Sequence, residues 1–154
     1  MDALDDKNKK IIKTLFDDGR MTVAEVEKRT KIRRDSVARR LKKMQSQNIL
    51  KFIPFFDPKL IGLPNFAILL IEVKTNPSES RDVFIKKMIG NKYVFQFSKI
   101  IGKFDFYCVL SHKDTKHLND LIEDIKSYVD GFIEDLEVYQ ISEEYKVEDM
   151  RELL

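Results

Sequence analysis

The stretch that decides the fold runs from residue 22 to residue 50 and reads TVAEVEKRTKIRRDSVARRLKKMQSQNIL. It contains two short helical patterns separated by a tight connection. From Lys28 to Lys43 there are nine lysines or arginines and one acid, Asp35. A small amphipathic helix with one apolar stripe and an otherwise basic surface suits a DNA groove. The stretch is therefore predicted to read DNA.

A capping residue and a glycine predict the limits of a first helix near the N-terminus. Asp5 is a good N-cap, because its carboxylate can accept a hydrogen bond from a free N–H group of the first turn. Gly19 is predicted to end the segment in a left-handed conformation. The apolar side chains of this segment share one helical face, which we assign to the core: Leu4, Ile11, Ile12, Leu15 and Phe16.

Two further helices are predicted to follow at close range. Thr22 and Glu25 have the spacing of a capping box, which begins the second helix. The third helix is predicted from about Arg34 to Gln47, with Asn48 as its left-handed stop. Its buried stripe consists of Val37, Leu41 and Met44. Three helices, the last two joined by a short turn, form a helix-turn-helix; the alternative is a three-helix packing unit with a charged surface.

Seven side chains at or near the third helix are candidates for DNA contact. On a helical wheel Arg39 lies opposite the buried stripe. It is flanked by Asp35, Ser36, Lys42 and Lys43. The candidates for base edges or the groove rim are Arg34, Ser36, Arg39 and Lys43. The candidates for phosphate contacts are Arg33, Arg40 and Lys42.

This part of the chain resembles the N-terminal domain of the Lrp/AsnC (feast/famine) transcriptional regulators. The first-helix pattern of that family, Leu-Asp-x-x-Asp-x-x-Ile-Leu-x-x-Leu, is similar to the segment from Leu4 to Leu15. Its third-helix pattern, Val-x-x-Arg-Ile/Val-x-x-Leu, is similar to the segment that begins at Val37. The usual Gly-Leu-Ser turn is replaced by residues 31–33, so that Arg33 stands in place of the capping serine, and the usual alanine of the second helix is Glu27. The cap of the third helix must therefore come from elsewhere.

Residues 51–64 are predicted to be a hinge strand and linker between two domains. Pro54 keeps the extended part out of the centre of a sheet, and the run from 57 to 64 is rich in turn residues. The segment resembles the hinge strand of the same family. Its aromatic side chains are predicted to pack against a second copy of the chain: Phe52, Phe55 and Phe56.

Residues 65–154 are predicted to form a ferredoxin-like domain with the order β-α-β-β-α-β. The fold class is then α+β, with an N-terminal helix-turn-helix (winged-helix-like) domain in residues 1–50. The first strand is apolar on both faces, with Phe66, Ile68 and Leu70 on one of them. Because the helices of this layout cover only one face, the other face predicts a homodimer joined sheet to sheet. A two-fold dimer would present two third helices about 34 Å apart, to successive grooves of a palindromic site.

The turn from Gly102 to Phe106 resembles the Gly-x-x-Asp-Tyr/Phe motif of the family's effector-sensing domain. In relatives that bind amino acids this turn lies between dimers and helps to line the effector pocket. The resemblance implies that Gly102 and Asp105 bind an amino acid or another small effector, and that dimers assemble into a tetramer or octamer. The family often has Thr or Ser where this chain has Ile101, so this chain lacks a hydroxyl that could contact a bound amino acid. The alternative, a hairpin glycine and a turn acid, stays open.

The charge of the chain is unevenly distributed. Residues 1–53 hold 15 lysines and arginines against 8 acids, a net charge of +7, whereas the remaining residues have a net charge of −5. A basic N-terminal part on an acidic C-terminal part suggests that the first part binds a polyanion, here double-stranded DNA.

The sequence shows no sign of a membrane protein, a metalloprotein or an enzyme. The longest apolar run has the length of a strand, and the N-terminus is too polar for a signal peptide, so a cytoplasmic location is expected. The single cysteine, Cys108, is predicted in the core, and His112 and His117 are predicted to be surface groups. No catalytic or phosphate-binding motif occurs, so no catalytic residue, metal or cofactor is expected.

These features predict a sequence-specific DNA-binding transcriptional regulator that binds palindromic operators as a dimer or higher oligomer, with an amino acid or other small effector as its modulator. The alternative is a metabolite-binding sensor whose basic domain docks on a protein or RNA partner.

Overall fold

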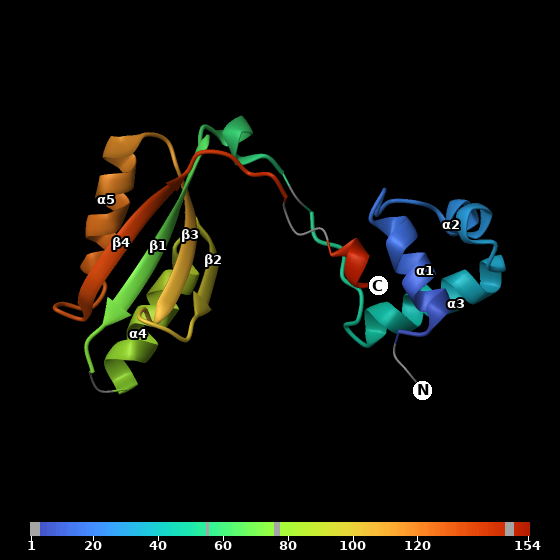
Figure 1. Cartoon of the computed structure of the whole chain (residues 1–154), viewed down its shortest axis with the longest axis horizontal. Helices are drawn as coiled ribbons and strands as arrows, with labels where there is room; N and C mark the ends of the chain where they lie inside the picture. Colours follow the sequence, from blue (N-terminus) through green and yellow to red (C-terminus); the bar gives the residue numbers. More distant parts are fainter. Residues whose placement is uncertain (1–3, 55, 76–77, 147–149) are drawn as a thin grey trace. The chain divides into compact units, whose positions relative to one another are not determined.

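The structure is a computed structural model that describes residues 4–54, 56–75, 78–146 and 150–154. The chain divides into two compact units (Figure 1). One comprises Met1–Phe55 together with Tyr145–Leu154, and the other comprises Phe56–Glu144. The division falls inside the predicted linker at residues 51–64. The last ten residues, assigned by the sequence to the second domain, belong instead to the first unit.

Three helices form the N-terminal unit: α1 (Asp6–Leu15), α2 (Val23–Thr30) and α3 (Arg34–Ser46). Asp5 caps α1, because its carboxylate accepts a hydrogen bond from the N–H of Asn8 at 2.8 Å. Thr22 and Glu25 form the reciprocal capping box at the start of α2. Asn48 has the left-handed φ of 55° after α3. These predicted helix limits are confirmed, and the described part of this unit contains no strand.

The core of the N-terminal unit is a single apolar cluster between the three helices. Its buried members are Ile11, Ile12, Leu15, Val26, Ile32, Val37 and Met44. Leu4 is 36% exposed, so its predicted core position is wrong. Gly19 is not among the residues with positive φ, so the predicted left-handed stop is also wrong. A Cβ at Gly19 would lie 3.4 Å from the ring of Phe52, which shows that this glycine leaves room for an aromatic side chain.

The end of the chain packs on this helical unit. A short 3-10 helix, η2 (Arg151–Leu153), places the Arg151 guanidinium 3.1 Å from the carboxylate of Asp17 and 5.7 Å from the centroid of the Phe16 ring. Leu154 packs against the apolar cluster. Asp17 also pairs with Arg29 of α2 at 3.0 Å, so one carboxylate joins the C-terminal residues to the helix-turn-helix.

The segment between the units leaves several apolar side chains in solvent. It contains a 3-10 helix, η1 (Pro58–Ile61), which Asp57 caps and Gly62 ends with a φ of 79°. Phe52 and Phe56 are 47% and 60% exposed, and Phe55 lies outside the described residues. Their packing against a second copy of the chain stays a prediction.

The second unit is a four-stranded antiparallel sheet with two helices. Its elements are β1 (Asn65–Val73), α4 (Ser78–Gly90), β2 (Val94–Lys99), β3 (Phe106–His112), α5 (Thr115–Lys126) and β4 (Ile133–Ile141). The strand order is β2-β3-β1-β4. This order is the ferredoxin-like layout, and the α+β class is confirmed. Among the described helices none combines the length and apolarity needed to cross a membrane.

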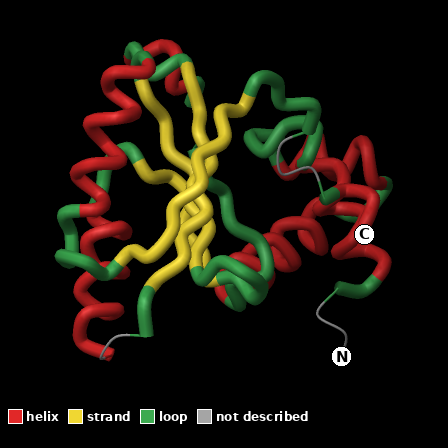
Figure 2. The backbone as a smooth tube through the Cα atoms, turned by 60° about the vertical axis from the view of Figure 1, so that its left-hand side comes forward, coloured by secondary structure: helices red, strands yellow, loops and turns green. Residues whose placement is uncertain are grey.

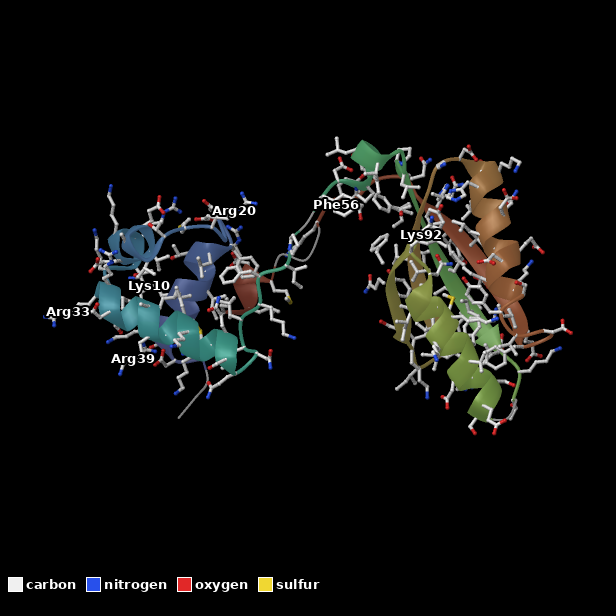
Figure 3. The ribbon with its side chains drawn as sticks, turned by 180° about the vertical axis from the view of Figure 1, so that it is seen from behind. Lys10, Arg20, Arg33, Arg39, Phe56 and Lys92 are labelled. Atoms are coloured by element: carbon white, nitrogen blue, oxygen red, sulfur yellow. The ribbon has the colours of Figure 1, made fainter. Side chains whose placement is uncertain are left out.

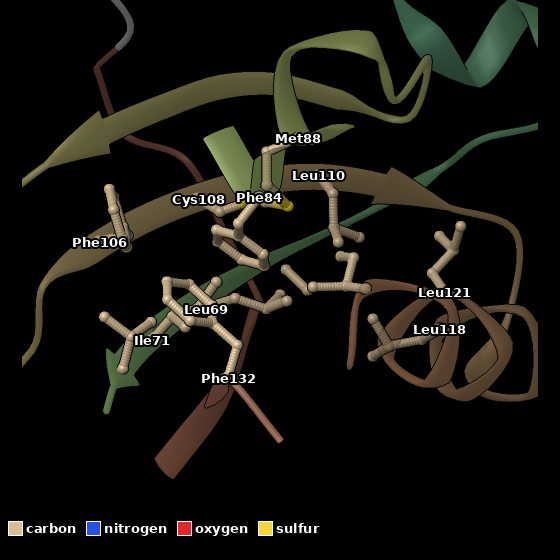
Figure 4. Packing of buried hydrophobic residues seen from close by; sticks show 13 residues of the cluster. Leu69, Ile71, Phe84, Met88, Phe106, Cys108, Leu110, Leu118, Leu121 and Phe132 are labelled. Carbon is tan, nitrogen blue, oxygen red and sulfur yellow. The ribbon is translucent and has the colours of Figure 1, made fainter. Parts of the chain in front are cut away.

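Both helices of this unit lie on the same face of the sheet (Figure 2). Alternate residues of β1 point to them, because side chains alternate between the faces of a strand. Ala67, Leu69 and Ile71 have no exposed surface. They pack with helix side chains in a continuous core, shown in Figure 4, that includes Phe84, Met88, Leu118, Leu121 and Ile125. In the described unit the opposite face, which carries Phe66, Ile68 and Leu70, has no such cover.

His112 corrects one expectation. It is 1% exposed, and its Nδ1 lies 3.1 Å from the carbonyl oxygen of Asp114. The sequence places it just before a helix, but it is also the last residue of the buried strand β3. Membership of that strand explains why it does not lie on the surface.

Cys108 is fully buried in the core, and this burial raises the pKa of its thiol to about 12. The thiolate is the reactive form of cysteine. We therefore expect no reaction with a disulfide reagent such as DTNB at pH 8 in the folded protein, and one equivalent of reaction in denaturant. Rapid labelling of the folded chain would show that the core opens readily at β3.

Candidate nucleic-acid interface

The orientation of α3 is fixed by its two buried side chains. Val37 and Met44 are 0% and 1% exposed and face the cluster between the three helices. The opposite side of α3 is open to solvent, and Figure 3 shows Arg33 and Arg39 extending away from α1 and α2. The exposed residues at the start and along the outer side of α3 are Arg33, Arg34, Asp35, Ala38, Arg39, Lys42 and Lys43.

Five of the seven predicted DNA contacts lie in this exposed set, and Ser36 is half-buried beside it. The seventh, Arg40, does not. Its Nη1 donates hydrogen bonds to both carboxylate oxygens of Asp5, at 2.8 and 2.7 Å, and to the side-chain oxygen of Asn8 at 2.8 Å. Arg40 stands three residues after Val37 and four before Met44, which places it on the inward side of the helix. We therefore replace its predicted phosphate contact with a structural link between α3 and α1.

The hydrogen bonds to Asp5 stabilise its ionised carboxylate. The hydrogen bond from the backbone N–H of Asn8, followed by the one from Arg40, lowers the pKa of the Asp5 carboxyl. The ionised carboxylate at the start of α1 also interacts favourably with the helix dipole. One aspartate thus caps α1 and holds the middle of α3.

The missing cap of α3 comes from α2. The N–H of Arg34 donates a hydrogen bond of 2.9 Å to the Oε1 of Glu27, while the side chain of Arg33 makes no capping bond. Lys31 takes the left-handed conformation of the usual glycine, with φ 61° and ψ 21°. Two departures from the family pattern, Glu27 and Arg33, therefore compensate each other. Glu27, in place of the usual alanine, supplies the hydrogen-bond acceptor that Arg33, in place of the usual serine, lacks.

This cap gives a direct prediction. Glu27→Ala is expected to lower the free energy of unfolding by about 1 kcal/mol, because N-cap acceptors contribute roughly that amount. Urea unfolding followed by circular dichroism measures the change. Glu27→Gln, which keeps an acceptor oxygen, should lose less. Adding Arg33→Ser to Glu27→Ala should restore stability through a local serine cap; equal stability of Glu27→Ala and the parent would contradict the role of Glu27.

The turn between β2 and β3 holds the two candidate effector residues. The Oδ2 of Asp105 accepts a hydrogen bond from the N–H of Val73 at 2.9 Å, and its Oδ1 lies 3.6 Å from Arg81. The guanidinium of Arg81 also stands 5.6 Å from the centroid of the Phe106 ring. Within one chain Asp105 therefore acts as a turn acid.

Gly102 has a φ of 155°, and no heavy atom would lie within 4 Å of a Cβ added there. The neighbouring Ile101 side chain is fully exposed. Among the residues that the structure describes, none covers the Ile101 side chain or fills the space beside Gly102.

Comparison with known proteins agrees with this geometry. The AsnC-type helix-turn-helix domain model matches residues 4–45. PH0061, an HTH-type transcriptional regulator of Pyrococcus horikoshii, is 30% identical over 150 residues, which cover 96% of this chain and 99% of that protein. Its crystal structure matches with a TM-score of 0.79 over 97% of this chain and all of that one.

Two further proteins share the sequence pattern or the fold. The HTH-type transcriptional regulator FL11 of Pyrococcus furiosus is 25% identical over 80% of this chain and 81% of its own length. A transcriptional regulator of Neisseria meningitidis, solved in complex with L-Met, has a TM-score of 0.85 at 19% identity, covering 94% of this chain and 93% of that one. With a helix-turn-helix, a ferredoxin-like second unit and a relative matched over nearly its whole length, the chain belongs to the Lrp/AsnC family of DNA-binding transcriptional regulators, which are not enzymes.

Proposed function

We propose that this regulator binds palindromic operator DNA as a homodimer whose subunits meet through the open face of the sheet. The observation that carries the proposal is the apolar character of that face. The half-buried side chains of Phe66, Ile68 and Leu70 run along β1. Phe95 of β2 and Tyr139 of β4 flank them with 58% and 51% of their surface exposed.

Such a surface supports association because apolar area gains free energy on leaving water, at roughly 25 cal/mol per Å². Large exposed apolar patches on one protein commonly mark sites of protein interaction. The rings of Phe66 and Phe95 meet edge to face with centroids 5.5 Å apart, so the patch is continuous from β1 to β2 across the intervening strand β3. A two-fold partner would cover the same patch on both copies.

A variant on the sheet face tests the dimer. Phe95→Glu places a charge in the proposed interface and should yield a monomer in analytical ultracentrifugation. Val83→Glu is the matched control, because Val83 is 46% exposed on α4, away from the open face, and this variant should stay dimeric. Persistence of the dimer in Phe95→Glu would contradict the sheet-to-sheet arrangement.

Selection from random double-stranded DNA tests the operator. A dimer should enrich two inverted half-sites whose centres are about 10 base pairs, or a multiple of that, apart. A single half-site would contradict the symmetric reader. Failure to enrich any DNA, together with enrichment of RNA or a protein, would favour the sensor alternative.

We also propose that an amino acid or a related small effector modulates binding at the β2–β3 turn. The Neisseria regulator with bound L-Met supports this proposal. In the proposed site the backbone at Gly102 approaches the effector, and Asp105 contributes through the turn that it holds. We propose the same surface as a contact between dimers in a tetramer or octamer, and the full exposure of the Ile101 side chain supports this.

A thermal-shift screen of the twenty amino acids, repeated in gel shifts with operator DNA, tests the effector. The active amino acid should raise the melting temperature and change operator affinity. Gly102→Val should abolish both effects while leaving DNA binding without effector intact. If the amino acid still changed the melting temperature and operator affinity of Gly102→Val, the effector site would have to lie outside this turn.

A further inference from the structure

The outer side of α3 carries one acid among its basic residues. Asp35 is exposed, and within the described residues its carboxylate has no hydrogen-bond or ion-pair partner. Between Lys28 and Lys43 it stands against nine lysines and arginines. A carboxylate at this position would be repelled by DNA phosphates, so its presence calls for a compensating interaction.

The geometry places Asp35 beside Arg39. Asp35 lies two residues before the buried Val37 in the sequence, and Arg39 lies two residues after it. Each residue of a helix is turned by about 100° from the last. Asp35 and Arg39 therefore lie about 40° apart, on either side of the line opposite Val37. Arg39 points away from the other helices (Figure 3), so the two side chains face the same space.

Asp35 lies in the first turn of α3, where a carboxylate interacts favourably with the helix dipole, but its side chain forms no capping hydrogen bond. The free N–H of Arg34 is already bonded to Glu27. Arg39 lies four residues on, at the spacing of a helical ion pair, yet the two form no salt bridge in the structure of the described residues. The carboxylate is thus available to a ligand that donates hydrogen bonds.

The first turn of a recognition helix reaches base edges in the major groove. The donors on those edges are the N4 amino group of cytosine and the N6 amino group of adenine. Adenine places the N7 acceptor beside its amino group, and this acceptor repels a carboxylate. Cytosine presents its amino group without such an acceptor, so it is the better partner for an aspartate.

We infer that Asp35 is a specificity-determining residue that reads a cytosine in each half-site, by accepting a hydrogen bond from the N4 amino group in the major groove. This inference rests on the proposed function, in which the outer side of α3 enters that groove. Arg39, beside it, neutralises part of the repulsion between the carboxylate and the phosphates.

The test is a selection from random double-stranded DNA with the full-length parent, Asp35→Ala and Asp35→Asn. The parent should return a motif with one strongly preferred C·G pair in each half-site. Asp35→Ala should lose the preference at that pair alone and keep the rest of the motif. Asp35→Asn should shift the same position towards adenine, because an amide can pair with adenine N6 and N7.

A matched control separates base reading from a general effect of charge. Asp6→Asn removes one acid from the first turn of α1 and should leave the motif unchanged. On the selected operator, changing the cytosine should weaken the parent about tenfold and Asp35→Ala hardly at all.

The outcomes distinguish the inference from the proposed function. A parent motif that persists in Asp35→Ala with undiminished preference at every position overturns the reading by Asp35 and leaves the proposed function standing. Equal changes in affinity for all sequences would also overturn it, since they would show a purely electrostatic role. A parent that selects no DNA motif overturns both.

Discussion

Arg39→Ala combined with Lys43→Ala is expected to weaken operator binding on the order of 100-fold, with the fold and the oligomeric state unchanged. Arg39 is exposed opposite the buried side of α3, and it has no side-chain partner within the described residues. A side chain that pairs well with a base edge contributes roughly 1–3 kcal/mol of discrimination, and each phosphate contact adds about one unit to the salt slope.

Gel-shift titrations at several salt concentrations measure both effects. If one of the two residues contacts a phosphate, the slope of log K against log salt should become shallower by about one unit. The matched control is Lys86→Ala with Lys92→Ala, which removes two exposed positive charges from the second unit. Unchanged operator affinity in the Arg39 and Lys43 variant would show that the outer side of α3 does not contact the operator.

The local features of the helix-turn-helix could be predicted from sequence because they depend on residues a few positions apart. Asp5 and Asn8, or Thr22 and Glu25, are three residues apart, and their hydrogen bonds form as soon as the helix does. The alternation of apolar residues in β1 similarly predicts two apolar faces. These patterns require no knowledge of the rest of the chain.

The features that sequence reasoning missed depend on contacts between distant residues. The position of Arg40 beside the buried stripe of α3 indicates that its side chain points inward. Its partner Asp5, however, lies 35 residues earlier in the sequence, so the pair could not be predicted. Glu27 was visible as a departure from the family pattern, yet only the packing of α2 against α3 shows that it caps Arg34. The docking of Arg151 on Asp17 joins residues 134 positions apart, and no local pattern indicates it.

The same distinction affects the candidate DNA contacts. A helical wheel separates buried from exposed positions, so it identified Arg39 correctly as an outward side chain. It does not show which basic residues are already bonded to another helix, and for this reason Arg40 was grouped with the phosphate contacts. Only the tertiary structure separates the basic residues that hold α3 in place from those open to a ligand.

The core of the second unit provides the prediction with the largest effect on stability. Phe84 has no exposed surface, and its ring meets four other aromatic rings at centroid distances of 5.2 to 6.4 Å: Phe97, Phe106, Tyr128 and Phe132. Phe84→Ala is expected to lower the free energy of unfolding by about 3–5 kcal/mol, because it removes this burial and leaves a cavity. Urea unfolding at a fixed protein concentration measures the loss.

Val83→Ala is the matched control for this loss. Val83 is the neighbour of Phe84 on α4 but is 46% exposed, so its truncation should change the free energy of unfolding by no more than about 0.5 kcal/mol. Protein concentration must be held constant, because the proposed dimerisation would add to the stability of the unit in proportion to the logarithm of concentration. Since Phe84 packs beneath the sheet whose opposite face forms the proposed interface, Phe84→Ala should also weaken the dimer. Operator binding should then fall even though α3 is unaltered. A variant that lost 3 kcal/mol but kept its dimer and its operator affinity would show that the interface lies outside this sheet.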